Sequence, residues 1–430
     1  MNKWIHGYLA DVTSYQKAGG TPSVSNPAFY DGDIPFVIIE DMTNSYRFLT
    51  KTEKKLTLEG VNNSSAWLVP EGHILYSMYA TVGKPVINKI DCATNQAIIA
   101  LKASDKVNSN YLFYWLEYIK PSIWKYTTQT TQSNLNAGVV RRLPVSYPED
   151  KNVQERISQI LTVVDDTIEK TQCLIHKYQK IKNGMMHDLF TRGLEANGRL
   201  RPKRELSPEL YKKTPLGWIP NDWIFSTCSN VCEKIIDCKN RTPQLLEEGY
   251  PVIRTPNVRN GEFVTEGLVY TDFQSFISWT ARGKPIPGDI VITREAPVGE
   301  VCKIPSDYPD VCLGQRMMLY RTDKEKIDND YFLYVLQSDF IQKRLDLISG
   351  GSTVGHVRVG DIKELWIVYP MDKGEQRKIA ATLNAITKKI TSLQLSLVKI
   401  KRKKNGIMSD LLTGKVSVQS KQEEIEATHV

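Results

Sequence analysis

Two stretches of the chain carry apolar residues at alternating spacings of three and four. The first runs from Ile157 to Leu189 and the second from Ile379 to Leu411. An a/d pattern sustained over about five heptads is typical of coiled-coil helices. A helix of about 38 residues spans roughly 55 Å at a rise of ~1.5 Å per residue. Because an apolar stripe must be buried against a partner, we predict that the two helices pair with each other.

The ends of these helices carry signals of their own. Asp150 and Asp372 follow strand-ending prolines and are the predicted N-cap residues, and Asp372 with Glu375 fits a capping box. Asn-Gly pairs at 183–184 and 405–406 are compatible with a kink or an early end of the regular helix. The end of the second helix is strongly basic, which indicates either a solvated helix face or contact with DNA phosphates; its cations are Lys399, Lys401, Arg402, Lys403 and Lys404.

The rest of the chain, outside the tail and a linker, is rich in short β-type runs punctuated by Pro, Gly, Asn and Asp. The predicted strands include 35–39, 72–76, 96–101 and 288–292, and the predicted short helices are 110–124 and 330–348. The fold class that follows is α+β, with two strand-rich domains and two long helices.

The second half of the chain repeats the first. Tyr147-Pro148 recurs as Tyr369-Pro370, and this offset of 222 gives an ungapped match over 45 residues. The preceding segments match more faintly at offsets of 216 to 220, as two copies of one fold with small loop insertions would. The predicted organisation is domain 1 at 1–146, a spacer helix at 147–192, an irregular linker at 193–216, domain 2 at 217–368, a second spacer helix at 369–414 and a disordered tail at 415–430.

Composition and charge narrow the class of protein. The 430 residues include 56 Lys and Arg against 48 Asp and Glu, a net charge of +8, which fits a nucleic-acid partner without requiring one. No apolar stretch approaches the ~18–20 residues of a membrane span, and the first residues contain no apolar signal segment. Seven cysteines, an odd number, favour free thiols in a reducing compartment, so we expect a cytoplasmic protein.

No complete catalytic or metal-binding pattern is present in the sequence. The phosphate-binding G-x-x-x-x-G-K-[ST] and the zinc-binding H-E-x-x-H are both absent. Asn26-Pro27-Ala28-Phe29 lacks the second proline of the Asn-Pro-Pro-aromatic motif of amino-methyltransferases. The cysteines lack C-x2-C spacing and nearby histidines, which argues against zinc. The sequence therefore predicts a binding protein without catalytic residues, metal ligands or a cofactor of its own.

Each domain has two polar loops suited to contact with a DNA groove. Gln and Asn can bond adenine bidentately, Arg and Lys can bond guanine, and glycine lets the backbone approach phosphate. One pair of loops is 127–134 and 349–358, and the other is 77–81 and 293–297. Each of these loops alone is compatible with an ordinary exposed loop. Loops of different sequence at the same place in two similar domains, however, favour two domains that each read a different half of a DNA site. The candidate DNA-binding residues are Ser77, Tyr79, Lys84, Gln129, Thr131, Gln132, Ser133, Asn134, Arg254, Asn257, Arg259, Thr293, Arg294, Arg316, Ser352, Thr353, His356 and Arg358.

Together these features closely resemble the specificity (S) subunit of type I restriction–modification systems. The resemblance covers nearly the whole chain up to the tail. It rests on Leu216-Gly217-Trp218-Ile219-Pro220, the Ala-x-Val-Gly turns at 80–83 and 296–299, the Tyr-Pro-x-Asp-Lys segments followed by Gln154 or Gln376, and the helix ends at 182–191 and 404–415. The second copy matches better, since His187, Phe190 and Arg192 depart mildly from the pattern.

The resemblance implies two target-recognition domains, each reading half of a bipartite sequence in double-stranded DNA, and two antiparallel helices that hold the domains apart. It also implies two docked adenine methyltransferase (M) subunits and, through them, restriction (R) subunits of a phage-defence complex. S-adenosylmethionine, ATP and Mg²⁺ are then expected on those partners alone. Within this hypothesis, Gln132→Ala alters one half-site and Arg358→Ala the other. Two alternatives stay open: a two-domain adaptor that binds protein or sugar through a coiled-coil spacer, and an enzyme with an unrecognised site.

Overall fold

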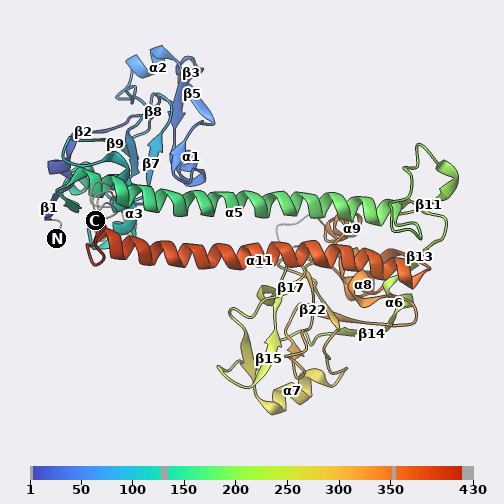
Figure 1. Cartoon of the computed structure of the whole chain (residues 1–430). Helices are drawn as coiled ribbons and strands as arrows, with labels where there is room; N and C mark the ends of the chain where they lie inside the picture. Colours follow the sequence, from blue (N-terminus) through green and yellow to red (C-terminus); the bar gives the residue numbers. More distant parts are fainter. Residues whose placement is uncertain (1–2, 127–133, 351–354, 419–430) are drawn as a thin grey trace, which may run out of the picture. The chain divides into compact units, whose positions relative to one another are not determined.

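The computed structural model forms two compact units (Figure 1). Unit 1 contains Met1–Leu174 and Leu393–Val430, and unit 2 contains Ile175–Ser392. Each unit therefore combines one strand-rich domain with parts of both long helices. The residues that the structure describes are 3–126, 134–350 and 355–418.

The strands of domain 1 are β1 (Trp4–Tyr8), β2 (Thr13–Ala18), β3 (Tyr30–Val37), β4 (Phe48–Leu49), β5 (Lys54–Leu56), β6 (Ile74–Ser77), β7 (Pro85–Asn88), β8 (Ala93–Thr94), β9 (Ile98–Ala103) and β10 (Pro144–Pro148). A five-stranded sheet has the order β2-β9-β6-β7-β4, and a three-stranded sheet has the order β5-β3-β8. β1 pairs antiparallel with β10, which joins the start of the domain to its end.

The helical elements of domain 1 are η1 (Leu9–Val12), η2 (Pro27–Phe29), α1 (Ile39–Asn44), α2 (Leu58–Asn62), α3 (Ser109–Ile119), η3 (Lys120–Tyr126) and α4 (Ala137–Arg141). α3 begins at Asn108, whose side chain accepts hydrogen bonds from the backbone N–H groups of Asn110 and Tyr111. Apolar and aromatic side chains of α3 share the main core of unit 1 with Ile74 and Tyr76 of β6.

The strands of unit 2 are β11 (Tyr211–Thr214), β12 (Gly217–Pro220), β13 (Trp223–Thr227), β14 (Cys232–Asp237), β15 (Tyr250–Ile253), β16 (Val258–Arg259), β17 (Glu262–Phe263), β18 (Val269–Thr271), β19 (Ile290–Thr293), β20 (Val301–Lys303), β21 (Cys312–Leu313), β22 (Met317–Thr322) and β23 (Trp366–Pro370). The sheet orders β14-β22-β19-β20, β18-β15-β21 and β13-β23 reproduce those of β2-β9-β6-β7, β5-β3-β8 and β1-β10. This shared topology confirms two copies of one α+β fold.

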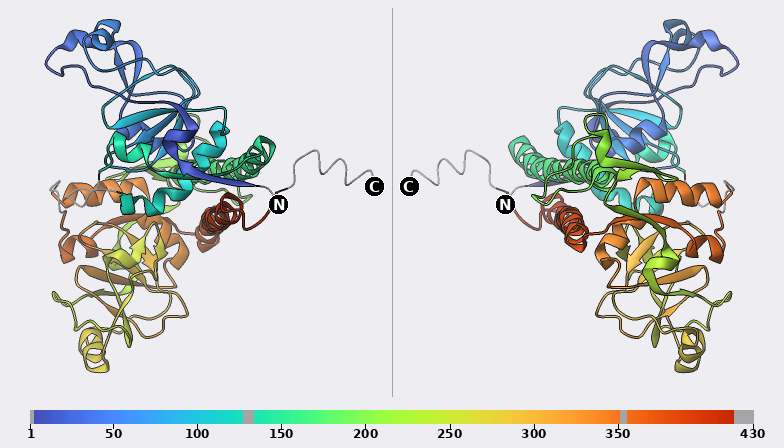
Figure 2. Two further views of the ribbon diagram at one scale, coloured as in Figure 1. Left: turned by 90° about the vertical axis from the view of Figure 1, so that its left-hand side faces the viewer. Right: turned by 90° about the vertical axis from the view of Figure 1, so that its right-hand side faces the viewer.

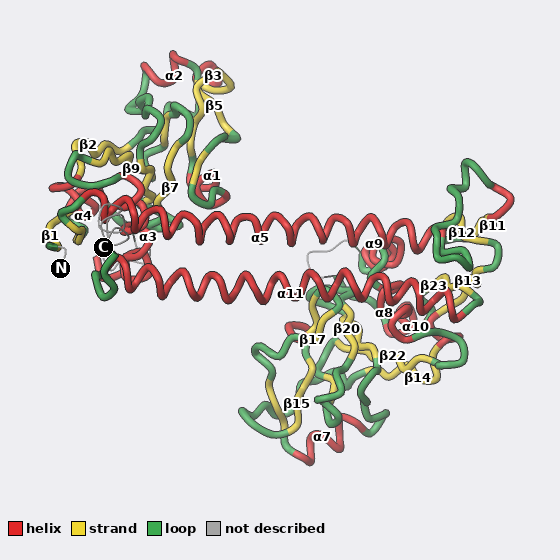
Figure 3. Tube along the Cα trace, viewed as in Figure 1, coloured by secondary structure: helices red, strands yellow, loops and turns green. Residues whose placement is uncertain are grey.

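The helical elements of unit 2 outside the long helices are η4 (Pro208–Leu210), α6 (Cys228–Val231), η5 (Thr255–Asn257), α7 (Phe273–Thr280), α8 (Asn329–Leu336), α9 (Asp339–Ile348) and α10 (Val359–Lys363). The single helix predicted at 330–348 is thus two helices, α8 and α9, separated at Gln337 and Ser338. The predicted linker is not irregular throughout, because its last residues form β11, the first strand of the β11–β12 hairpin (Figure 3). The predicted domain boundaries stay a prediction.

The long helices are α5 (Lys151–Arg192) and α11 (Lys373–Leu412), of 42 and 40 residues. Figure 2 shows both nearly end-on. The predicted N-caps are confirmed, because Asp150 accepts from the Asn152 N–H and Asp372 accepts from the Gly374 and Glu375 N–H groups. Neither Asn-Gly pair ends its helix. The predicted capping box is wrong in its second half, since the Glu375 carboxylate bonds to Leu194 and Arg201 instead.

The two helices pack together in antiparallel fashion. In unit 1 the first part of α5 shares a core with the last part of α11, through residues such as Leu161 and Leu411. In unit 2 the last part of α5 shares a core with the first part of α11, through residues such as Leu189 and Leu383. The apolar seam inferred from the heptad pattern is confirmed.

Two equivalent glutamines hold the first turn of each long helix against its domain. Gln154 is fully buried; its amide donates to the carbonyls of Pro148 and Lys106, and its Oε1 accepts from Asn108 N at 2.7 Å. Gln376 makes the same three contacts with Pro370, Lys326 and Asp328. Each glutamine thereby links a β-strand, a helix N-cap and a long helix.

Candidate DNA interface

Ser77 and Thr293 close equivalent turns in the two domains. Ser77 Oγ donates to Thr81 O and accepts from Lys84 N at 3.0 Å, and Thr293 Oγ1 donates to Pro297 O at 2.6 Å and accepts from Glu300 N at 3.0 Å. Both side chains are fully buried. Their hydroxyls serve the turn, so we remove these two residues from the candidate DNA contacts.

Asn257 has a similar internal role. Its Oδ1 accepts from Arg254 N at 3.1 Å, its Nδ2 donates to Val264 O at 3.0 Å, and the residue is fully buried. The matched residue of domain 1, Asp41, accepts from Ile38 N at 2.9 Å in the same way. Asn257 is therefore also removed from the candidate DNA contacts.

In each domain, backbone hydrogen bonds join the loop at 77–81 or 293–297 to a residue in or directly after the other predicted loop and to a third segment, and we call this place the loop junction. In domain 1 the junction consists of Met78, Ala97 and Leu135: Met78 N donates to Ala97 O at 2.8 Å and Leu135 N donates to Met78 O at 2.9 Å. In domain 2 it consists of Arg294, Arg316 and Val357, with Arg294 N bonded to Arg316 O at 2.8 Å and Val357 N to Arg294 O at 3.1 Å. The same backbone bonds thus bring together segments far apart in the sequence.

The loop junction of domain 2 carries a cluster of charges. Glu295 lies between Arg316 and His356: its Oε2 is 2.9 Å from Arg316 Nε and its Oε1 is 2.6 Å from His356 Nδ1. Beneath them, the mostly buried Arg294 lies 3.8 Å from a carboxylate oxygen of Asp237, at the end of β14. Arg316 and His356 each leave about half of the side chain exposed, at 45% and 51%.

The equivalent positions of domain 1 carry uncharged side chains. Met78, Tyr79, Ala97 and Asn134 stand where domain 2 has Arg294, Glu295, Arg316 and His356. Tyr79 is exposed and Met78 is buried. The two domains therefore present different chemistry on the same set of backbone hydrogen bonds.

The other candidate DNA-binding residues are not part of the loop junction as defined above. Lys84 is half-buried and donates to the carbonyls of Thr43 and Ser45; burial, with the charge of Lys120, lowers the pKa of Lys84. Arg254 and Arg259 are half-buried and donate to backbone carbonyls, whereas Arg358 is exposed just before α10. Six candidates lie outside the described residues: Gln129, Thr131, Gln132, Ser133, Ser352 and Thr353.

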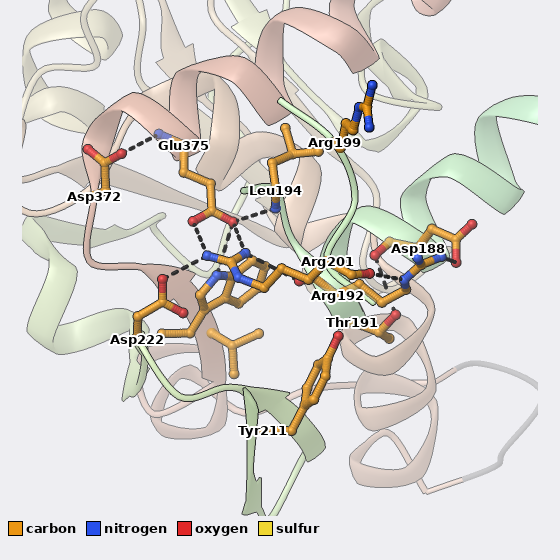
Figure 4. A network of polar contacts seen from close by, with 12 residues as sticks. Asp188, Thr191, Arg192, Leu194, Arg199, Arg201, Tyr211, Asp222, Asp372 and Glu375 are labelled. Atoms are coloured by element: carbon orange, nitrogen blue, oxygen red, sulfur yellow. Dashed lines mark hydrogen bonds and ion pairs between the residues drawn. The ribbon is translucent and has the colours of Figure 1, made fainter. Parts of the chain in front are cut away.

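A buried ion-pair network at the end of α5 was not predicted from the sequence (Figure 4). Glu375 of α11 accepts from Leu194 N at 2.7 Å, from Trp223 Nε1 at 3.2 Å and from both Nη groups of Arg201 at 2.6 and 2.9 Å. Arg201 also bonds Asp222 at 2.7 Å. The network fastens the residues after α5 to the first turn of α11. One signal in the sequence points to this network: Glu375 lies in the first turn of the second helix, whereas the equivalent residue of the first helix is Val153.

Within the described ranges, no group of three or more His, Cys, Asp or Glu residues is arranged to hold a metal ion. All seven cysteines are free thiols. No helix in the described part of the chain is long and apolar enough to cross a membrane.

Comparison with models of known protein families shows which family the chain belongs to. The model of the type I restriction modification DNA specificity domain matches residues 1–178 and 220–402. The chain belongs to this family. Members of the specificity family are DNA-recognition subunits without catalytic activity, and the two matched segments correspond to the two halves of the repeat.

Relatives in the specificity family match along most of their length. The putative type I restriction enzyme MjaX specificity subunit of Methanocaldococcus jannaschii is 28% identical over 327 residues, covering 74% of this chain and 70% of the relative. The MjaVIII specificity subunit of the same organism is 24% identical over 425 residues, covering 97% and 94%. The crystal structure of the type I S subunit from M. genitalium has the same fold, with a TM-score of 0.56 at 14% identity over 95% of this chain and 96% of that one.

Proposed function

We propose that each domain of this specificity subunit reads one half of a bipartite DNA target and that the long helices dock two methyltransferase subunits. The observation that carries the proposal is the loop junction, where the same backbone bonds present a charged cluster in domain 2 and uncharged side chains in domain 1. Direct readout depends on side chains at base edges, so unlike side chains on one scaffold suit unlike half-sites.

The surface of the long helices suits docking of protein partners. Exposed apolar residues lie on both helices, among them Val163 and Leu174 on α5 and Leu395 and Val398 on α11. Lys399, Lys401, Arg402 and Lys403 of α11 are exposed, whereas Lys404 is buried. Exposed apolar side chains on the two helices offer a partner protein apolar surface to bury. A solved structure with a TM-score of 0.53 to this chain concerns complex assembly of the type I restriction–modification system.

On this proposal, methyl transfer and cleavage take place on partner subunits, through which restriction subunits join the complex. S-adenosylmethionine, ATP and Mg²⁺ belong to those partners. Family membership sets aside the protein- or sugar-binding adaptor.

Substitutions at one matched position test the assignment of domains to half-sites. Asn134→Ala and His356→Ala change equivalent residues of the two loop junctions. In the complex with methyltransferase subunits, we expect each variant to relax base preference by about tenfold at one position of one half-site only, because a good side-chain contact with a base edge is worth about 1–3 kcal/mol. The measurement is selection of methylated duplexes from a randomised pool, followed by sequencing.

Each of these variants is the control for the other. Relaxation of both halves by either variant contradicts the proposal. So does uniform loss of binding to all sequences, which indicates a phosphate contact.

A further inference from the structure

Arg316 stands out in the loop junction of domain 2 because of its backbone. Its φ of 75° lies in the left-handed region, which residues with a Cβ rarely adopt and glycine adopts freely. Strain of this kind persists at positions that serve a function. Core packing of the side chain does not offset this strain, because the side chain is 45% exposed.

The contact that the described residues make with the Arg316 guanidinium involves Nε and not its outer donors. The guanidinium is held through Nε, at 2.9 Å from Glu295 Oε2. Among the described residues, its two Nη groups have no hydrogen-bond partner. A guanidinium fixed through Nε presents its remaining N–H groups as a pair, which matches the O6 and N7 acceptors of guanine.

The neighbouring carboxylate decides between a base and a phosphate as the ligand. Glu295 bonds Arg316 and His356 with its two oxygens and keeps a fifth of its side chain exposed. Its negative charge repels a phosphate approaching the same guanidinium, but it opposes the uncharged edge of a base far less. The Arg294 N–H to Arg316 O bond further fixes the backbone that carries this side chain.

We propose that Arg316, oriented by Glu295, reads a guanine in the half-site of domain 2. The inference rests on the proposed function of one domain per half-site. Domain 1 has Ala97 at this position, so its half-site receives no such contact there.

The test uses the full chain in complex with its methyltransferase subunits and a duplex pool randomised in both half-sites. Arg316→Lys keeps the charge and loses the paired donors, and Arg316→Gly relieves the left-handed backbone, so the second variant folds at least as well as the parent. Lys284→Ala removes an exposed cation of the same domain that pairs with Asp310, and is the matched control.

We expect the parent and Lys284→Ala to require guanine at one position of the domain 2 half-site. Both Arg316 variants should lose at least tenfold of that preference and keep every other position unchanged. The inference is overturned if the parent shows no guanine preference in this half-site, if the preference survives in both variants, or if binding weakens equally for all sequences. Loss of preference in both half-sites at once contradicts the proposed function itself.

Discussion

Replacing Lys404 with methionine is expected to lower the free energy of unfolding by about 3–5 kcal/mol, the cost of removing one partner from a buried ion pair. Lys404 Nζ lies 2.7 Å from Glu117 Oε2 and 2.8 Å from Asp165 Oδ1, and the lysine and aspartate side chains are 7% and 2% exposed. Without the ammonium group, the Asp165 carboxylate stays buried with no cation to compensate its charge.

Apart from Lys404, the described residues around Asp165 stabilise its carboxylate little. Tyr46 OH donates to Asp165 Oδ1 at 2.8 Å, and Asp165 Oδ2 has no hydrogen-bond partner among the residues that the structure describes. Burial and the Asp165 charge raise the pKa of Tyr46, which therefore stays a neutral donor. The rings of Tyr46 and Tyr114 lie 5.6 and 5.7 Å from the ammonium nitrogen of Lys404. A single hydrogen bond from Tyr46 does not replace the ion pair that Asp165 loses.

The repeat supplies a matched control for this substitution. Lys182 of α5 is equivalent to Lys404, but among the described residues it forms no ion pair, and its Nζ lies 5.4 Å from the Tyr334 ring. Burial lowers the pKa of Lys182, so its charged form is disfavoured in the folded chain. We expect Lys182→Met to change stability by no more than about 1 kcal/mol, since a cation–π contact is worth about 0.5–2 kcal/mol and the desolvation cost opposes it.

Urea denaturation of the two variants and the parent makes the comparison. Adding Asp165→Asn to Lys404→Met should restore part of the lost stability, because it removes the uncompensated charge. Equal effects of Lys182→Met and Lys404→Met, or no rescue by Asp165→Asn, would show that the ion pairs are not the source of the stability.

Replacing Glu375 with alanine is the second substitution with a large expected effect, also about 3–5 kcal/mol. The carboxylate is 6% exposed and accepts hydrogen bonds from Arg201, Leu194 N and Trp223. Its removal leaves the Arg201 guanidinium, itself 12% exposed, with Asp222 as its remaining ion-pair partner. Two buried N–H donors, those of Leu194 and Trp223, lose this acceptor as well.

Asp222→Asn is the control for Glu375→Ala within the same network. Asp222 bonds the same arginine but is 59% exposed, and an exposed ion pair is worth about 1 kcal/mol or less. Thermal unfolding of both variants should show a large loss for Glu375→Ala alone. Similar losses for the two variants would contradict the assignment of Glu375 as the centre of the network.

The sequence predicts the elements of this chain well where one pattern repeats many times. The heptad stripe specifies both long helices, because each turn adds the same signal, and the offset of 222 predicts that they are equivalent. The sequence identifies Gln154 and Gln376 only as shared motif residues, whereas the structure shows that each joins a strand, an N-cap and a helix.

Residues that contact DNA are harder to predict from the sequence, because polarity does not tell which way a side chain points. Ser77, Thr293 and Asn257 are polar loop residues, yet all three are buried. Comparison of the two copies adds information that polarity lacks: Ser77 and Thr293 are alike and hold equivalent turns, whereas the matched residues Ala97 and Arg316 differ. The network around Glu375 has no counterpart in the first copy, so the repeat could not predict it.

The most direct test of the central claim is the methylome of a cell that expresses this chain with its methyltransferase subunit. One specificity subunit with two unlike reading domains predicts a single split motif, with two different half-sites and a fixed gap between them. A contiguous motif, or a gap that varies from site to site, would contradict the assignment of one half-site to each domain.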